Sequence, residues 1–196
     1  MEYKIEEWEE MDLLVHAKEF HAETSETQIP MFWDEYYANE EYRKIPGYLG
    51  VCAQEKSKGD EFKYGIGCKA TDVEGIPDGF EIIHIPKYEW AVFKCVGPSP
   101  KAIQDMWERI YKEWLPVSDY ELIPDVDIEN YLPGDPSSQD YVSEICIPVQ
   151  KKTVNSVNGG KGRIFWSLEN DGRTIYYTLL LSRDGSVEKH NESSRG

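Results

Sequence analysis

The stretch PSPKAIQDMWERIYKEWLP, residues 98–116, decides the fold, because it is an amphipathic helix set between strand-like segments. Its apolar side chains recur every three or four residues, the period of a helix with one buried face. Proline at position 116 marks its end. The apolar stripe consists of Ile103, Met106, Trp107, Ile110 and Trp114. A helix of this kind between strands predicts an α+β fold, in which the helix covers a sheet.

An earlier segment has the same character. Residues 29–43, IPMFWDEYYANEEYR, carry aromatic side chains at helical spacing, which predicts a second amphipathic helix with Pro30 in its first turn. Runs rich in β-branched and aromatic residues, separated by turn residues, predict the strands. These are expected at residues 3–20 (bent near 10–12), 48–54, 61–70, 80–97, 120–131 and 141–149.

The order of these elements repeats, because strand–helix–strand–strand occurs twice. We therefore expect one domain over residues 1–150, built from modules at about 1–75 and 76–150. The duplication predicts antiparallel sheets related by a pseudo-two-fold axis, with the helices on one face and a ligand cleft between the modules. Residues 151–196 are expected to form a linker, a β-hairpin over 162–185 and a disordered tail.

Charge limits the classes of partner. The net charge is −16, and it is unevenly spread. Residues 1–150 carry 32 acidic and 13 basic side chains, whereas residues 151–196 carry 5 acidic and 8 basic ones. An acidic body repels phosphate backbones, so direct nucleic-acid binding is not expected, whereas a cation or a basic protein partner would fit.

Other composition signals favour a cytoplasmic protein. No apolar run approaches the ~20 residues that span a bilayer, and the N-terminus lacks a secretory signal pattern, so no membrane association is expected. The four cysteines form no CxxC pair and are expected to be reduced core residues. Neither a set of metal ligands nor a nucleotide-binding motif is present, so no metal and no cofactor is expected.

The run YVSEICIPVQ, residues 141–150, places Glu144 inside an otherwise apolar strand. Alternation directs Ile145, Ile147 and Val149 toward the helix that carries Trp107, and turns Glu144 to the other face. That face is solvent in a single sheet, but it would border a cleft if a second module lay opposite. A desolvated carboxylate then needs hydrogen bonds or a cationic ligand, because uncompensated burial is costly.

Further candidates are weaker, and each has an alternative as a core or surface residue. Glu129 and Tyr131 share one face of their strand, where they could supply a second pocket carboxylate and the hydroxyl that fixes it. Aromatic side chains could wall the cleft with the amphipathic surfaces that suit ligands. The aromatic candidates are Trp90, Tyr88 and Tyr64 on strands, and Trp107 and Trp33 on helices.

Residues 107–149 resemble the second half of the GyrI-like, or AraC-type effector-binding, domain. The marks are Trp-Leu-Pro at 114–116, Glu-x-Tyr at 129–131 and Glu-Ile-x-Ile-Pro-Val at 144–149. The first half agrees more loosely, through IPMFWDEYY, YGIGCKA and IPKYEWAVFKCVG. The resemblance covers about residues 1–150 and implies the two-module fold that the duplication also predicts.

The resemblance implies ligand binding. Members of this family bind lipophilic, often cationic, small molecules between the modules, in a pocket walled by aromatic residues. A buried Glu of the last strand faces the ligand, and Glu144 matches that Glu. The chain differs from the pattern at His16-Ala17, where a Gly is common, and in its C-terminal hairpin.

Three functions follow as hypotheses. Because the 196 residues contain no helix-turn-helix segment, the first is a stand-alone protein, similar to bacterial transcription regulators, that senses or sequesters lipophilic and cationic compounds. The second is a hydrolase of strained, cyclopropane-type electrophiles, in which Glu144, with Glu129 or Tyr131, activates water. The third is an acidic interaction protein that binds a basic partner such as a topoisomerase.

Overall fold

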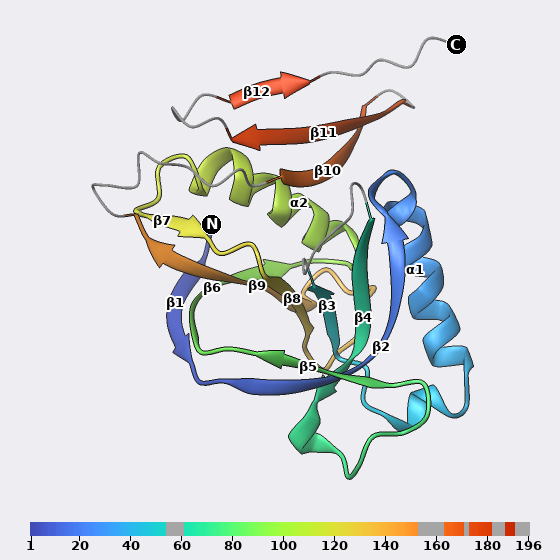
Figure 1. The fold of residues 1–196 in the computed structure, drawn as a ribbon. Helices are drawn as coiled ribbons and strands as arrows, with labels where there is room; N and C mark the ends of the chain where they lie inside the picture. The colour runs from blue at the N-terminus through green and yellow to red at the C-terminus, as the bar shows by residue number, and fades with distance from the viewer. Residues whose placement is uncertain (54–60, 153–162, 171–172, 182–186, 191–196) are drawn as a thin grey trace.

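The computed structural model describes residues 1–53, 61–152, 163–170, 173–181 and 187–190 (Figure 1). Side chains are described through residue 152, apart from that of Glu26. The described part contains a nine-stranded antiparallel sheet, two helices that pack against it, and a separate three-stranded sheet. The fold is therefore α+β.

The large sheet runs in the order β1-β6-β9-β8-β3-β4-β2-β5, with the short strand β7 beside β9. If β2, β3 and β4 are matched with β6, β8 and β9, this order reads the same from either end. Such an order agrees with two repeats that meet at the β3–β8 pair, while the pseudo-two-fold axis itself stays a prediction. The strands are β1 (Tyr3–Trp8), β2 (Met11–His21), β3 (Leu49–Ala53), β4 (Glu61–Lys69), β5 (Glu81–Ile85), β6 (Tyr88–Val96), β7 (Tyr120–Leu122), β8 (Val126–Tyr131) and β9 (Val142–Lys151).

Both helices cover the same face of the large sheet. Helix α1 (Ala22–Ala38) packs on β2 and β4, and helix α2 (Lys101–Arg109) packs on β6 and β9 before it continues as a π-helical turn, Ile110–Trp114. Because side chains alternate along a strand, the residues under the helices form one set. Each helix and the strands beneath it form one apolar cluster. The buried members of the α2 cluster include Phe93, Ile103, Met106, Ile110, Trp114, Ile145, Ile147 and Val149. Those of the α1 cluster are Phe20, Phe32, Tyr36, Tyr64 and Ile66.

The opposite face of the sheet holds a second apolar core. The sheet is strongly curved, and the chain bends where β1 passes into β2 and where β5 passes into β6 (Figure 1). This core is built from the alternate residues of the same strands, so β2 and β6 are apolar on both faces. Its buried members are Leu13, Val15, Leu49, Val51, Ile85, Trp90, Val92, Val126, Ile128 and Cys146.

Helix α1 differs from its expected bounds. It begins at Ala22 instead of residue 29, so Pro30 lies inside the helix and not in its first turn. The added turns are polar and mostly exposed, and therefore lack the apolar period by which a helix is recognised. The helix ends at Ala38, and Tyr42–Lys44 forms a separate 3₁₀ turn.

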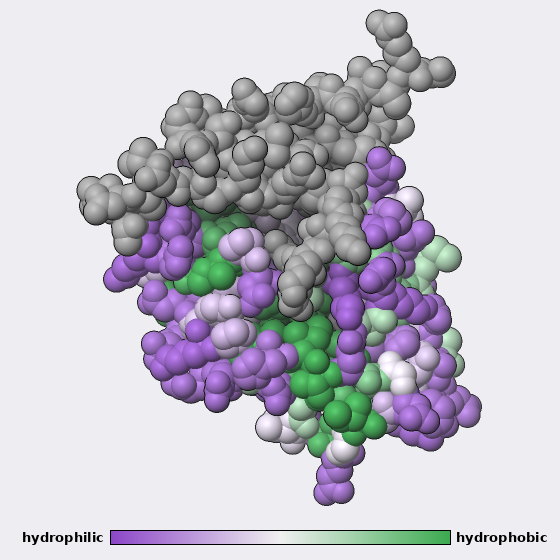
Figure 2. Space-filling model, in the orientation of Figure 1, coloured by the Kyte–Doolittle hydropathy of each residue, from purple (hydrophilic) through white to green (hydrophobic). Residues whose placement is uncertain are grey.

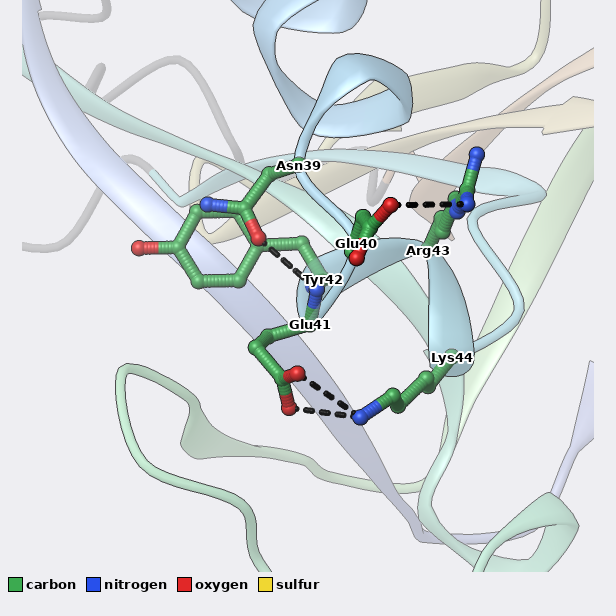
Figure 3. A network of polar contacts seen from close by, with 6 residues as sticks. All are labelled: Asn39, Glu40, Glu41, Tyr42, Arg43 and Lys44. Carbon is green, nitrogen blue, oxygen red and sulfur yellow. Dashed lines mark hydrogen bonds and ion pairs between the residues drawn. The ribbon is translucent and has the colours of Figure 1, made fainter.

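Asn39 organises the chain after α1 (Figure 3). Its Oδ1 accepts hydrogen bonds from the backbone N–H groups of Glu41, at 2.9 Å, and Tyr42, at 3.2 Å. Two ion pairs, Lys44 with Glu41 and Arg43 with Glu40, lie beside it on the surface. The turn holds the Tyr42 ring against His16, with ring centroids 4.1 Å apart.

The C-terminal region contains the expected hairpin and one further strand. Strand β10 (Arg163–Asn170) pairs with β11 (Arg173–Leu181), which also pairs with β12 (Val187–His190), inside the segment expected to be a disordered tail. Strand β10 approaches α1. The expected linker at 153–162 and the centre of the hairpin turn at 171–172 lie outside the described residues.

The described residues on the face shown in Figure 2 are largely hydrophilic. On the side shown in Figure 2, charged and polar residues dominate, and hydrophobic residues gather in a smaller area near β5. Among the described residues, no helix has the length and apolar character required to cross a membrane.

Candidate functional site

A carboxylate lies on β8 between the two helices. Glu129 alternates with the core residue Ile128, so its side chain points to the helix face of the sheet. Its strand neighbours are Gly50 on β3 and Ile145 on β9. A Cβ atom at Gly50 would lie 2.1 Å from the Tyr64 hydroxyl and 3.2 Å from Glu129 Oε2. Only glycine at position 50 therefore leaves room for both groups.

Three donors hold this carboxylate. Glu129 Oε2 accepts hydrogen bonds from the Tyr131 hydroxyl, at 2.9 Å, and from the Tyr64 hydroxyl, at 3.1 Å. Glu129 Oε1 lies 3.4 Å from the indole Nε1 of Trp107, which donates from α2. On the other side, Trp33 Nε1 of α1 donates to the Tyr64 oxygen at 3.1 Å. Both helices are thus connected to Glu129, one directly and one through Tyr64.

Aromatic rings line both sides of the carboxylate. The Trp33 ring meets Tyr131 edge-on, with centroids 5.0 Å apart, and stacks on Tyr37 at 6.0 Å. On the α2 side, Trp107 stacks on Tyr111, with centroids 5.7 Å apart and 13° between the planes. Tyr111 belongs to the π-helical turn, a feature often found at functional sites. These rings present flat faces of the kind that bind organic cations.

Burial controls the electrostatics of the site. It raises the pKa of the Glu129 carboxyl, although the hydrogen bonds from Tyr131, Trp107 and Tyr64 act in the opposite direction. Burial and the charge of Glu129 raise the pKa of the Tyr64 and Tyr131 hydroxyls well above the usual range, so both remain donors. Among the residues whose side chains are described, no lysine, arginine or histidine pairs with Glu129.

The structure brings five of the eight predicted ligand residues together. They share one face of the sheet and the two helices above it, and each of them contacts another member of the group. The candidate site in the structure therefore forms around Glu129, the weaker of the two carboxylate candidates, and a ligand role for these residues stays a prediction. The five residues are Glu129, Tyr131, Tyr64, Trp107 and Trp33.

Glu144 lies on the opposite face of the sheet. Its carboxylate accepts a hydrogen bond from Asn130 Nδ2 at 2.9 Å, and Asn130 alternates with Glu129 on β8. The cleft is expected on the Glu144 face of this strand, and a ligand role for Glu144 stays a prediction. Alternation assigned Ile145 and Glu144 to the proper faces, but that second face is filled by the apolar core around Cys146.

Trp90 and Tyr88 also lie away from the site. Trp90 is fully buried in the second core and stacks on Trp8, with centroids 4.8 Å apart. The Tyr88 hydroxyl donates to Asp125 at 2.8 Å on the same face. These contacts are those of core packing, and a ligand role for either residue stays a prediction.

Three residues of the site were not among the candidates. Tyr111 lies four residues after Trp107, and Tyr37 lies four residues after Trp33, so helical spacing could have identified both as stacking partners. Gly50 left no signal in the sequence, because its role depends on the approach of Tyr64 from the neighbouring strand.

The structure thus has a curved antiparallel sheet, two helices on one of its faces, and a carboxylate with aromatic neighbours between them. The chain belongs to the Cass2 family of integron-associated effector-binding proteins, whose sequence model matches residues 4–149. The resemblance to GyrI-like effector-binding domains is thereby confirmed.

Solved structures share the fold. SAV2435 bound to tetraphenylphosphonium has a TM-score of 0.65 and 22% identity, over 76% of this chain and 94% of that one. A putative bacterial transcription regulation protein from Staphylococcus aureus MU50 has a TM-score of 0.64 and 23% identity, over 76% and 99%. An integron cassette protein from the mobile metagenome of Vibrio cholerae has a TM-score of 0.59 and 16% identity, over 76% and 95%. A comparison with curated proteins gave no match.

Proposed function

We propose that this protein binds lipophilic organic cations between α1 and α2, with Glu129 as the counter-charge. One observation carries the proposal: Glu129 is held by three neutral donors and pairs with no basic side chain among those described. A partly buried carboxylate of this kind lacks a positive partner, and a cationic ligand would supply one. In this proposal Glu129, and not the Glu144 that the sequence favoured, is the negative counter-charge for the ligand.

The aromatic surroundings support a lipophilic ligand. Trp107 and Tyr111 are partly exposed, so their rings are accessible to a ligand. Their stacking and the hydrogen bond from Trp107 to Glu129 hold the two rings in place. Cation–π attraction to such rings contributes about 0.5–2 kcal/mol each, depending on desolvation. Relatives add support, because a protein with the same fold was solved with tetraphenylphosphonium, which is a lipophilic cation.

The test is binding of tetraphenylphosphonium, measured by isothermal titration calorimetry and by quenching of tryptophan fluorescence. Glu129→Gln keeps the size of the side chain and removes its charge. We expect this change to weaken binding by about 10- to 100-fold, which corresponds to about 1.4–2.8 kcal/mol. Glu144→Gln is the matched control, since Glu144 lies on the other face of the sheet, and it should bind within about twofold of wild type.

A neutral ligand separates charge from shape. Triphenylphosphine oxide offers similar rings without the positive charge, so its weaker binding should be the same in wild type and Glu129→Gln. Equal affinity of wild type and Glu129→Gln for tetraphenylphosphonium would contradict the proposal. A loss confined to Glu144→Gln would return the role to that residue. Product analysis of mixtures with strained electrophiles distinguishes binding from turnover.

A further inference from the structure

The two oxygens of Glu129 are in different environments. Oε2 receives the two shorter hydrogen bonds, from Tyr131 and Tyr64, whereas Oε1 receives a single long contact from Trp107 Nε1. A carboxylate oxygen has two lone-pair sites, so two donors saturate Oε2 and leave Oε1 with capacity to spare. The acceptor capacity that remains for a ligand is therefore at Oε1, on the α2 side.

The two sides of Glu129 also differ in how accessible they are to a ligand. Tyr64 is 4% exposed and lies against Gly50, so the β4 side of Oε2 is enclosed by protein. On the Oε1 side, Trp107 and Tyr111 are partly exposed and stack almost in parallel. A flat or multi-ring cation can meet those faces without displacing a buried side chain.

We propose that the positive group of the ligand binds on the Oε1 side of Glu129 against Trp107, and that Tyr64 and Trp33 are positioning residues which hold the carboxylate without touching the ligand. This inference rests on the proposed function and divides its site into a contact side and a support side. Trp33 acts through Tyr64, because its indole N–H donates to the oxygen that in turn donates to Oε2. Linked hydrogen bonds of this kind strengthen one another.

The division predicts separate effects on pH dependence and on affinity. Binding needs the ionised carboxylate, so affinity falls as the pH drops through the pKa of Glu129. Loss of a donor to Oε2 raises that pKa, so binding is lost at a higher pH, while the affinity reached at high pH is unchanged. Loss of a contact residue lowers that high-pH affinity.

One other carboxyl lies close, because Asp127 is two residues before Glu129 on β8 and shares its face. Asp127 is present in every variant, so its effect is common to all of them and cancels in the comparison. The other groups that face Glu129 are Tyr64 on β4, Tyr131 on its own strand, Cys52 on β3 and Cys95 on β6. Burial, together with the charge of Glu129, raises the pKa of each of them, so all four remain neutral while the carboxyl titrates. From the helices, the groups that contact Glu129 or Tyr64 are the indoles of Trp107 and Trp33, which do not titrate.

The experiment measures tetraphenylphosphonium affinity by calorimetry from about pH 4 to about pH 9, a range that covers carboxyl titration. In Tyr64→Phe the pH of half-maximal affinity should rise by about one unit, and the high-pH affinity should stay within about twofold. Trp33→Phe should give a smaller rise in the same direction. Trp107→Leu should lower the high-pH affinity by about tenfold.

Tyr3→Phe is the matched control, because Tyr3 of β1 is exposed and its ring contacts Phe93 and Trp114 instead of Glu129. It should change neither quantity. A uniform loss of affinity at every pH in Tyr64→Phe, or unchanged high-pH affinity in Trp107→Leu, would overturn the inference. If Tyr64→Phe fails to fold, Trp33→Phe tests the same point, because it too should shift the pH of half-maximal affinity and leave the high-pH affinity unchanged. Failure of the proposed function is seen separately, as full binding by Glu129→Gln.

Discussion

Gly50 influences the position of the Glu129 carboxylate because, without a side chain, it leaves room for Glu129 and Tyr64. In Gly50→Ala the new methyl group would overlap the Tyr64 hydroxyl and press on Glu129 Oε2. Overpacking of this kind costs about 1–3 kcal/mol of stability. We expect weaker tetraphenylphosphonium binding together with a lower free energy of unfolding, measured by chemical denaturation of the same preparation.

A double-mutant cycle gives the control for this prediction. Tyr64→Phe removes the oxygen that the alanine methyl group would strike, although the ring carbon stays 2.9 Å from the new Cβ. Gly50→Ala should therefore cost less stability in the Tyr64→Phe background than in wild type. Equal costs in the two backgrounds would show that the clash with the hydroxyl is not the cause.

Among the elements, the turn after α1 depends on Asn39. Its side chain accepts from two backbone N–H groups that would otherwise lack a partner, and it leads into the turn that carries Tyr42 (Figure 3). Asn39→Ala should lower the free energy of unfolding by about 1 kcal/mol, the typical value for a lost cap. Asn39→Asp keeps the acceptor and should behave like wild type in the same denaturation experiment. Equal losses in both variants would assign the effect to the amide N–H₂ group.

The elements also show how far sequence patterns reach. Alternation in YVSEICIPVQ correctly placed Ile145 and Ile147 under α2, and helical period found the segment around Trp107. The alternation of side chains along one strand cannot show which face of a curved sheet packs against a second core, because that packing depends on strands far away in the sequence. The sequence therefore favours Glu144, whereas the surroundings of Glu129 depend on Tyr64 and Trp107, which come from another strand and from a helix.

At the scale of the whole molecule, the site is shared between the two repeats. The first repeat supplies Trp33 and Tyr64, whereas the second supplies Glu129, Tyr131 and Trp107. Neither repeat contains the carboxylate together with all of its donors. The central β3–β8 pair joins the repeats directly beneath the site, because Gly50 lies opposite Glu129. The hydrogen bond from Tyr64 to Glu129 therefore joins the two repeats.

The arrangement of the whole chain also predicts which residues are sufficient for folding and binding. Both helices, all nine strands of the large sheet and every described contact of Glu129 lie before residue 153, and the Cass2 match ends at residue 149. A chain of residues 1–152 should therefore fold and bind tetraphenylphosphonium within about threefold of the full chain, a difference below 1 kcal/mol. Calorimetry on both chains measures this, and Glu129→Gln in the shortened chain is the control. A larger loss of affinity in a folded 1–152 chain would show that β10, which approaches α1, completes the site.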